Sequence, residues 1–289
     1  MRATLNTDNR PSANLRAALH GWHERLPETW AGHFADVDLA FDEFDACSPK
    51  ALPHEFWPTE ERSAAAMTIS PFKPLHDLSP AMVRVVIIGR DPYPNRAQAT
   101  GRSFEQGDLV DWAESFTNPR RLSTSLRHIA IAATAFGHGD GWADRVGVAD
   151  RPALRMALRR NRTGLPPPDR CFAEWAEQGV LWLNRAATFS SKIEQAAHSE
   201  LWKPFTSRMM RVLALESRSR RVVVALWGGN AQQLARESWR EFAGKGLRVI
   251  TAPHPSASGV AFLASGNPLA QINDELDPEH RIAWTASAV

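Results

Sequence analysis

Four short apolar runs dominate the hydrophobic pattern of this chain. They are rich in Val, Ile and Leu, are each followed by polar or turn-forming residues, and cover 83–88, 180–183, 222–227 and 247–251. Continuous apolar runs of this length are typical of strands that are buried on both faces of a parallel sheet. We therefore predict four buried, mainly parallel strands.

Segments with helical periodicity lie between and after these runs. Apolar residues recur at three- and four-residue spacing, with charged residues between them, over 122–136, 172–178, 201–215 and 231–242. Alternation of buried strands with such helices is typical of a parallel sheet that is covered on both faces. The predicted fold is an α/β single domain with a central four-stranded, mainly parallel sheet flanked by helices. Residues 1–30 read as an N-terminal helix or tail of undetermined role, and 31–289 form the domain.

Composition narrows the class of protein. The chain has 289 residues, 43% of them hydrophobic, which is enough for a substantial core. It has neither a run of about twenty apolar residues nor an apolar signal segment, so we expect a cytoplasmic protein without a membrane anchor. Cys47 and Cys171 are too few for a disulfide framework or a four-ligand zinc site, and we expect free, buried thiols. The net charge is only +2, so binding to a polyanion must rest on local clusters.

Polar side chains stand where the predicted strands end. Asp91 and Tyr93 follow the first run, Asn184 the second and His254 the fourth. In parallel α/β sheets, ligands bind beyond the carboxyl ends of the strands, so these side chains are expected on one rim. Each residue alone has an ordinary explanation as a turn former, a cap or a core residue. The ordered set favours a binding or catalytic site.

The segments at these strand ends carry four motifs. They read GRDPYPNRAQATGRSF at 89–104, GVLWLN at 179–184, LWGGNAQ at 226–232 and APHPSASG at 252–259. In this order they resemble the motifs GQDPYHGPGQAHGLxFS, GVLLLN, LWGSxAQ and APHPSPLS of the uracil-DNA glycosylase family. The resemblance covers roughly 53–284. It implies a base-flipping enzyme of base excision repair that removes uracil from single- or double-stranded DNA and leaves an abasic site. The chain carries no signal for a metal or organic cofactor, and we expect a monomer because the DNA-facing rim must stay open.

The resemblance also implies roles for individual residues. Asp91 orients or deprotonates the attacking water and favours the cationic sugar, while His254, as a neutral imidazole, donates a hydrogen bond to uracil O2. Asn184 pairs with the O4 and N3–H groups of uracil, a pattern that cytosine reverses. Phe104 stacks on the flipped base, and Tyr93 excludes the methyl group of thymine. Arg90 stands in the uracil-binding segment, where the backbone faces the base.

The chain departs from the family at several positions. Arg90 replaces a Gln and Pro94 a His, and a guanidinium beside Asp91 is expected to lower the pKa of its carboxylate or to pair with a DNA phosphate. Ser258 stands where the family has its Leu wedge. Further positions expected to contact DNA are Arg121, Arg185, Gly229, Ser256 and Phe262, with Gly229 and Arg121 replacing serines of the family.

Two interpretations of the DNA-facing positions stay open. The lost wedge is replaced by Phe262 or Leu263, or the enzyme prefers single strands. Arg96, Arg102, Arg121 and Arg185 bind phosphates, or some of them pair with acids such as Glu105 and Asp108.

A basic insertion at about 137–170 carries several arginines and ends in three prolines. A solvated surface excursion is somewhat favoured for it over a direct contact with DNA. For the whole chain, the main alternative function is a protein that binds uracil-containing or abasic DNA with weak or no turnover. A nucleotide or nucleoside hydrolase is disfavoured, because the chain has no glycine-rich loop of the P-loop form. A glycosylase for another deaminated base is disfavoured by Tyr93 and Asn184.

Overall fold

A four-stranded parallel sheet forms the centre of the protein. The computed structural model describes residues 9–49, 55–59, 61–62, 68–118, 121–138, 163–238, 246–257, 259–264 and 266–286. The central strands are β3 (Val85–Gly89), β4 (Val180–Asn184), β5 (Val222–Trp227) and β6 (Leu247–Ala252). They are arranged in the order β4-β3-β5-β6, and every neighbouring pair is parallel. This confirms the predicted sheet. A separate antiparallel pair joins β1 (Glu61–Arg62) to β2 (Thr68–Ile69).

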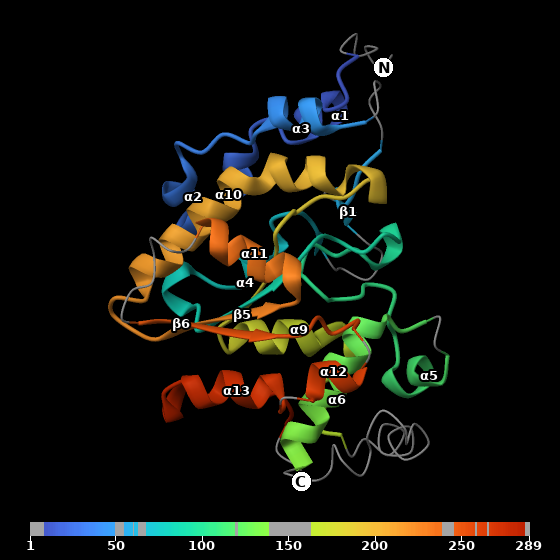
Figure 1. The fold of residues 1–289 in the computed structure, drawn as a ribbon, viewed down its shortest axis with the longest axis vertical. Coiled ribbons are helices and arrows are strands. Elements are labelled where there is room, and N and C mark those ends of the chain that lie inside the picture. Colours follow the sequence, from blue (N-terminus) through green and yellow to red (C-terminus); the bar gives the residue numbers. More distant parts are fainter. Residues whose placement is uncertain are drawn as a thin grey trace.

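Helices connect the strands and cover both faces of the sheet (Figure 1). Their bounds are α1 (Ala13–Ala18), α2 (Glu28–Phe34), α3 (Phe41–Cys47), α4 (Lys73–Asp77), α5 (Trp112–Thr117), α6 (Thr124–His138), α9 (Pro168–Glu177), α10 (Gln195–Glu216), α11 (Gly229–Ser238), α12 (Gly259–Leu263) and α13 (Pro268–Glu275). Short 3-10 turns are η1 (Trp22–Arg25), η2 (Pro80–Met82), η3 (Arg96–Gln98), η4 (Lys192–Glu194) and η5 (Pro278–His280). The four predicted helices correspond to α6, α9, α10 and α11.

Alternate residues of each inner strand pack into two separate cores, one on each face of the sheet. Val86 and Ile88 of β3 belong to the core beneath α10, while Val85 and Ile87 belong to the core that includes α6, α9 and α13. Figure 1 shows α1, α2, α3 and α10 on one side of the sheet and α6, α9, α12 and α13 on the other. Strand β6 differs from the prediction of a fully buried run, because as an edge strand it leaves Val249 48% exposed. The rigid inner strands hold the loops at their carboxyl ends.

The described part of the 1–30 segment packs onto the domain. Leu15, Trp22 and Trp30 are buried in the core beneath α10. Most of the predicted basic insertion, 139–162, lies outside the described residues, and the division of the chain at residue 30 stays a prediction. Cys171 is buried as expected, but Cys47 is exposed because it ends α3 on the surface, so the expectation of two buried thiols is wrong for that residue.

Candidate active site

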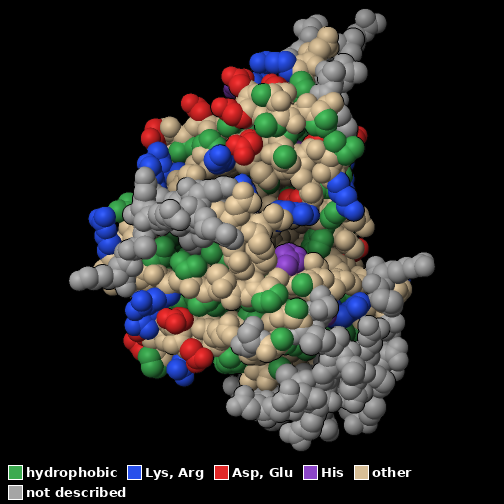
Figure 2. Space-filling view, in the orientation of Figure 1, with side chains coloured by type: hydrophobic (Ala, Val, Ile, Leu, Met, Phe, Trp, Pro, Cys, Tyr) green, Lys and Arg blue, Asp and Glu red, His purple; other side chains and the backbone are tan. Residues whose placement is uncertain are grey.

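The polar residues at the strand ends meet in one pocket. The cavity has a volume of about 300 Å³ and opens at the carboxyl ends of the parallel strands. Its lining includes Arg90, Asp91, Tyr93, Phe104, Asn184, Gly229, His254 and Ser256. Figure 2 shows a histidine in a hollow near the middle of this face, with Lys or Arg side chains beside it. The structure therefore brings together the residues that the sequence placed on four separate segments.

Both oxygens of the Asp91 carboxylate accept hydrogen bonds. Arg90 Nε donates to Oδ1 at 3.1 Å, and Gln195 Nε2 donates to Oδ2 at 2.6 Å. Burial raises the pKa of Asp91 above its ordinary value, and the charge of Arg90 and both hydrogen bonds act in the opposite direction. The expectation that Arg90 lowers this pKa holds for its own contribution, but burial outweighs it. Asp91 is thus a partly desolvated carboxylate fixed on two sides.

Sequence reasoning missed Gln195. It is the first residue of α10 and lies 104 residues from Asp91 along the chain. The turn before it is anchored by Glu194, a fully buried carboxylate that accepts hydrogen bonds from Ser48 and Ser190. No strand-end motif marks this position. The signal available in the sequence was a polar residue at the start of a helix, which is too common to single out.

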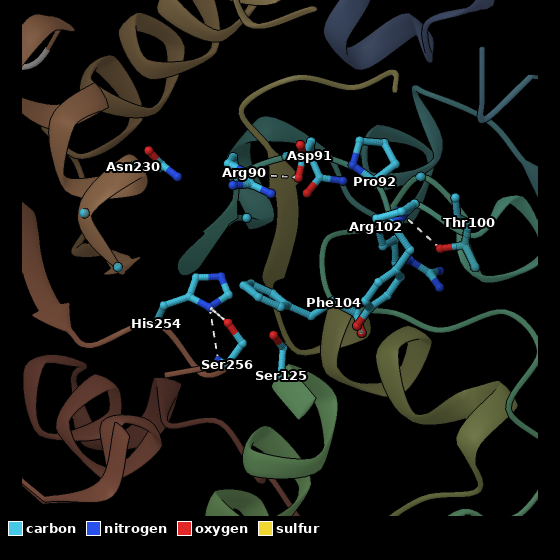
Figure 3. A pocket seen from close by; sticks show the side chains of 18 residues that line it. Arg90, Asp91, Pro92, Thr100, Arg102, Phe104, Ser125, Asn230, His254 and Ser256 are labelled. Carbon is cyan, nitrogen blue, oxygen red and sulfur yellow. Dashed lines mark hydrogen bonds and ion pairs between the residues drawn. The ribbon is translucent and has the colours of Figure 1, made fainter. Parts of the chain in front are cut away.

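His254 presents Nε2 as its donor. The backbone N–H of Ser256 donates to His254 Nδ1 at 3.0 Å, and the Ser256 hydroxyl lies 2.7 Å from the same atom (Figure 3). Because a backbone N–H can only donate, Nδ1 is the acceptor and the proton of the neutral ring sits on Nε2. Burial, assisted by the charge of Arg90, lowers the pKa of His254 below its ordinary value. The ring is held neutral and ready to donate a hydrogen bond.

Asn184 offers an unsatisfied amide oxygen. Its side chain is 4% exposed and lines the pocket, and its buried Oδ1 has no hydrogen-bond partner among the described residues. The end of β3 leaves room for it, because a Cβ added at Gly89 would lie 2.6 Å from this oxygen. A buried acceptor without a donor costs about 1–3 kcal/mol. A ligand that supplies an N–H group at this point would recover that energy.

Two aromatic side chains complete the pocket wall. Phe104 has a φ of 62°, which is rare for a residue with a side chain, and its ring centroid lies 6.0 Å from that of His254. Tyr93 donates its hydroxyl proton to the carbonyl oxygen of Phe104 at 3.0 Å and lies 2.7 Å from the Ser123 hydroxyl. Burial raises the pKa of Tyr93, so the phenol stays neutral. These contacts fix the Tyr93 ring beside Phe104.

A buried ion-pair network supports this wall from behind. Arg102 donates to Asp77 through Nε and Nη2 at 2.5 and 2.6 Å and to Glu105 at 2.6 Å, and Lys73 donates to Glu105 at 2.9 Å. Arg102 and Glu105 flank Phe104 and fasten the loop in which its unusual backbone conformation occurs. For Arg102, the alternative of pairing with nearby acids holds, so a role in binding phosphate is contradicted.

Among the residues predicted to contact DNA, Phe262 is too deeply buried for that role. It is 0% exposed in α12, and its ring packs edge-to-face on Trp227 with centroids 5.2 Å apart. It cannot enter a base stack without leaving the core that it shares with Trp227. Leu263, the other candidate wedge, is partly buried against the same core. Ser258, at the family's wedge position, lies outside the described residues.

The other predicted DNA contacts lie on or near the rim. Gly229 begins α11 at the pocket, and a Cβ added there would meet nothing within 4 Å. Ser256 is exposed and is held by His254. Arg121 pairs with Glu114 at 3.0 Å, with both side chains 63% exposed. Arg185 directly follows Asn184 and is half-buried. None of these positions excludes a contact with DNA.

Among the described helices, none has the length and apolar character needed to cross a bilayer. The same part of the chain contains no group of three or more His, Cys, Asp or Glu side chains that could hold a metal ion.

The fold and the pocket define an α/β protein that binds its ligand at the carboxyl ends of a parallel sheet, through a carboxylate, an amide and a neutral imidazole. A family model described as "Uracil DNA glycosylase superfamily" matches residues 76–277. The chain belongs to this superfamily.

Known proteins agree with this assignment. The chain is 29% identical over 238 residues to a uracil-DNA glycosylase of Chlamydia trachomatis, with 81% of this chain and 80% of that protein covered. It is 25% identical over 277 residues to uracil-DNA glycosylase 2 of Streptomyces avermitilis, with 90% and 95% covered. The solved UNG structure from Nitratifractor salsuginis shares the fold, with a TM-score of 0.60 at 21% identity, covering 95% of this chain and 99% of that one.

Proposed function

We propose that this protein is a DNA glycosylase that hydrolyses the N-glycosidic bond of uracil in DNA, releasing uracil and leaving an abasic site for base excision repair. The observation that carries the proposal is the pocket itself. Within about 300 Å³ it gathers a carboxylate, a neutral imidazole donor and an amide with a free acceptor. Its family relatives carry the name of this activity.

The reaction needs opposite charges to be stabilised on adjacent groups. The bond between C1′ and N1 breaks, its electron pair leaves with uracil, and the sugar becomes oxocarbenium-like. Asp91 favours this cation by its negative charge and takes the proton of the water that attacks C1′. His254 donates its Nε2 proton in a hydrogen bond to the O2 atom, where the charge of the leaving uracil gathers. The lowered pKa of His254 suits a donor that must stay neutral.

The same pocket supports a choice of uracil over other bases. Asn184 Oδ1 accepts the N3–H proton of uracil, whereas N3 of cytosine has no proton and would leave this buried oxygen unpaired. Tyr93, fixed by Phe104 and Ser123, closes the space beside C5 against a methyl group. The cost of about 1–3 kcal/mol for one unpaired buried group corresponds to roughly 5- to 140-fold discrimination.

A second candidate is a protein that binds uracil-containing or abasic DNA and turns over slowly. One observation favours it: each oxygen of Asp91 already accepts a hydrogen bond, from Arg90 or from Gln195, which leaves the carboxylate a weaker acceptor for a proton from water.

Matched oligonucleotides that carry uracil, cytosine or thymine at one position test the choice between these functions. We expect release of uracil alone from single- and double-stranded forms, measured as strand scission after alkaline cleavage of the abasic product. Tight binding of the uracil strand without release would replace the glycosylase with the binding protein. Comparable release of thymine would contradict the role given to Tyr93.

A further inference from the structure

Arg90 binds the Asp91 carboxylate from the solvent side. Its bond to Asp91 is made through Nε at 3.1 Å, and the Arg90 side chain is 46% exposed while that of Asp91 is 11% exposed. Gln195 binds the other oxygen from the protein side and at a shorter distance, 2.6 Å. Asp91 is thus held on one side by a fixed neutral amide and on the other by an exposed cation at the mouth of the pocket.

The hydrogen bond between Arg90 and Asp91 is of a kind that can break when another acceptor reaches Arg90. It is a single hydrogen bond through Nε, whereas the strongest contacts of arginine with oxyanions use two parallel N–H groups. The guanidinium of the pair is the exposed partner, so solvent screens its charge and the Arg90 side chain has room to move. In Figure 3, Arg90 lies between Asp91 and Asn230, across the pocket from His254. A DNA strand that places its uracil in this pocket brings its phosphates to the same mouth.

We propose that Arg90 is a positioning residue that acts as a phosphate-operated latch: it holds Asp91 Oδ1 in the free protein and moves to a backbone phosphate of the bound strand, which frees that oxygen for the attacking water. The proposal rests on the glycosylase function proposed above. The two non-bridging oxygens of a backbone phosphate can accept two parallel N–H bonds from the planar guanidinium, where Asp91 accepts only one. The latch makes the carboxylate available when a DNA strand, and not a free nucleoside, fills the site.

The electrostatics of the pocket give the latch a measurable signature. Besides Arg90 and Asp91, the pocket-lining groups that carry charge or titrate are Tyr93, Arg102 and His254, and Arg102 is held by its own buried partners. In the free protein, the charge of Arg90 lowers the pKa of both Asp91 and His254. Losing that charge raises both pKa values, so the acid limb of activity moves to higher pH. If Arg90 leaves Asp91 in the complex, this shift is confined to the free protein.

The test compares Arg90→Gln, which removes the charge but keeps a hydrogen-bonding amide, with Arg90→Lys and with the control Arg218→Gln. Arg218 is an exposed residue in the turn before β5, at the opposite end of the sheet. The profile of kcat/KM against pH reports the free protein, and that of kcat reports the complex. We expect Arg90→Gln to move the acid limb of kcat/KM to higher pH and to leave that of kcat in place. Arg90→Lys should stay near the wild type, and the control should change neither profile.

A second experiment tests the contact between Arg90 and a DNA phosphate directly. Binding of a single strand with a cleavage-resistant 2′-fluoro-deoxyuridine is measured over a range of salt concentrations, and Arg90→Gln should reduce the slope of log K against log salt by about one. Equal shifts of both acid limbs, no shift of either, or an unchanged salt slope would each overturn the latch. A wild type that binds the strand but releases no uracil would overturn the proposed function instead, and the salt slope would still decide whether Arg90 meets phosphate.

Discussion

Removing the Gln195 side chain tests how the site holds its carboxylate. In Gln195→Ala, Asp91 Oδ2 loses the 2.6 Å hydrogen bond that reaches it from the start of α10. Arg90 remains on Oδ1, so the carboxylate keeps one partner and gains freedom to rotate. We expect slower release of uracil together with an altered pH profile.

The size of the effect follows from the type of bond. A hydrogen bond to a charged group contributes about 1.5–3 kcal/mol, which corresponds to roughly 12- to 140-fold if all of it serves the transition state. Because Arg90 still orients Asp91, we expect a fall in kcat near the lower end, about tenfold. The Gln195 hydrogen bond also lowers the pKa of Asp91, so its loss raises that pKa. Activity requires the carboxylate, is present above this pKa and is lost below it, so the acid limb moves to higher pH.

Single-turnover release of uracil from a single-stranded oligonucleotide, measured across the acid range, shows both the lower rate and the shift of the acid limb. Ser199→Ala is the matched control, because Ser199 donates to the Gln195 carbonyl oxygen at 2.9 Å in the same helical turn and does not bind Asp91. We expect this control to keep the wild-type rate and profile. A Gln195→Ala variant with the wild-type rate at every pH, or a control that loses as much activity, would show that the hydrogen bond from Gln195 to Asp91 does not support the reaction.

Two further substitutions test the supporting structure. Glu105→Gln removes the buried carboxylate that binds Arg102 and Lys73. Burial raises the pKa of Glu105, but the two cations lower it by more, so its pKa lies below the ordinary value. The ion pairs therefore stabilise the fold at neutral pH, and this stabilisation is lost as the pH falls below the ordinary range of a glutamate. We expect a loss of about 3–5 kcal/mol at neutral pH that shrinks in acid, measured by denaturant unfolding at both pH values, and an unchanged midpoint would contradict it. Phe262→Ala should cost about 3–5 kcal/mol of stability as a core truncation and leave the ratio of duplex to single-strand activity unchanged. A selective loss of duplex activity at unchanged stability would show that Phe262 does reach DNA.

The fold and the centre of the pocket could be predicted because their signals are local. A buried parallel strand reads as an unbroken apolar run, and the residue that ends it is fixed in space by the sheet. Asp91, Asn184 and His254 are therefore placed together from three short segments, and the structure confirms that they line one cavity.

The features that were missed depend on long-range packing. Gln195 binds Asp91 across 104 residues of sequence, and the neighbouring Glu194 is held by Ser48, 146 residues earlier in the chain. Phe262 is predicted as a wedge because it lies a few residues after the family's wedge position, and a five-residue helix such as α12 has too little periodicity to show that this side chain is buried. The sequence around an arginine in a loop, such as Arg102, does not show whether the side chain binds a phosphate or a buried carboxylate. Only the fold, which brings Asp77 to it, decides between them.

In the proposed reaction, hydrolysis of the glycosidic bond depends on the charge of Asp91. The most direct measurement is release of uracil from a single-stranded oligonucleotide by wild type and by Asp91→Asn, which keeps the shape of the side chain and removes its charge. Loss of a general base predicts a fall of about 10²–10⁴-fold, with binding of the oligonucleotide retained. An Asp91→Asn variant that releases uracil at the wild-type rate would contradict the account.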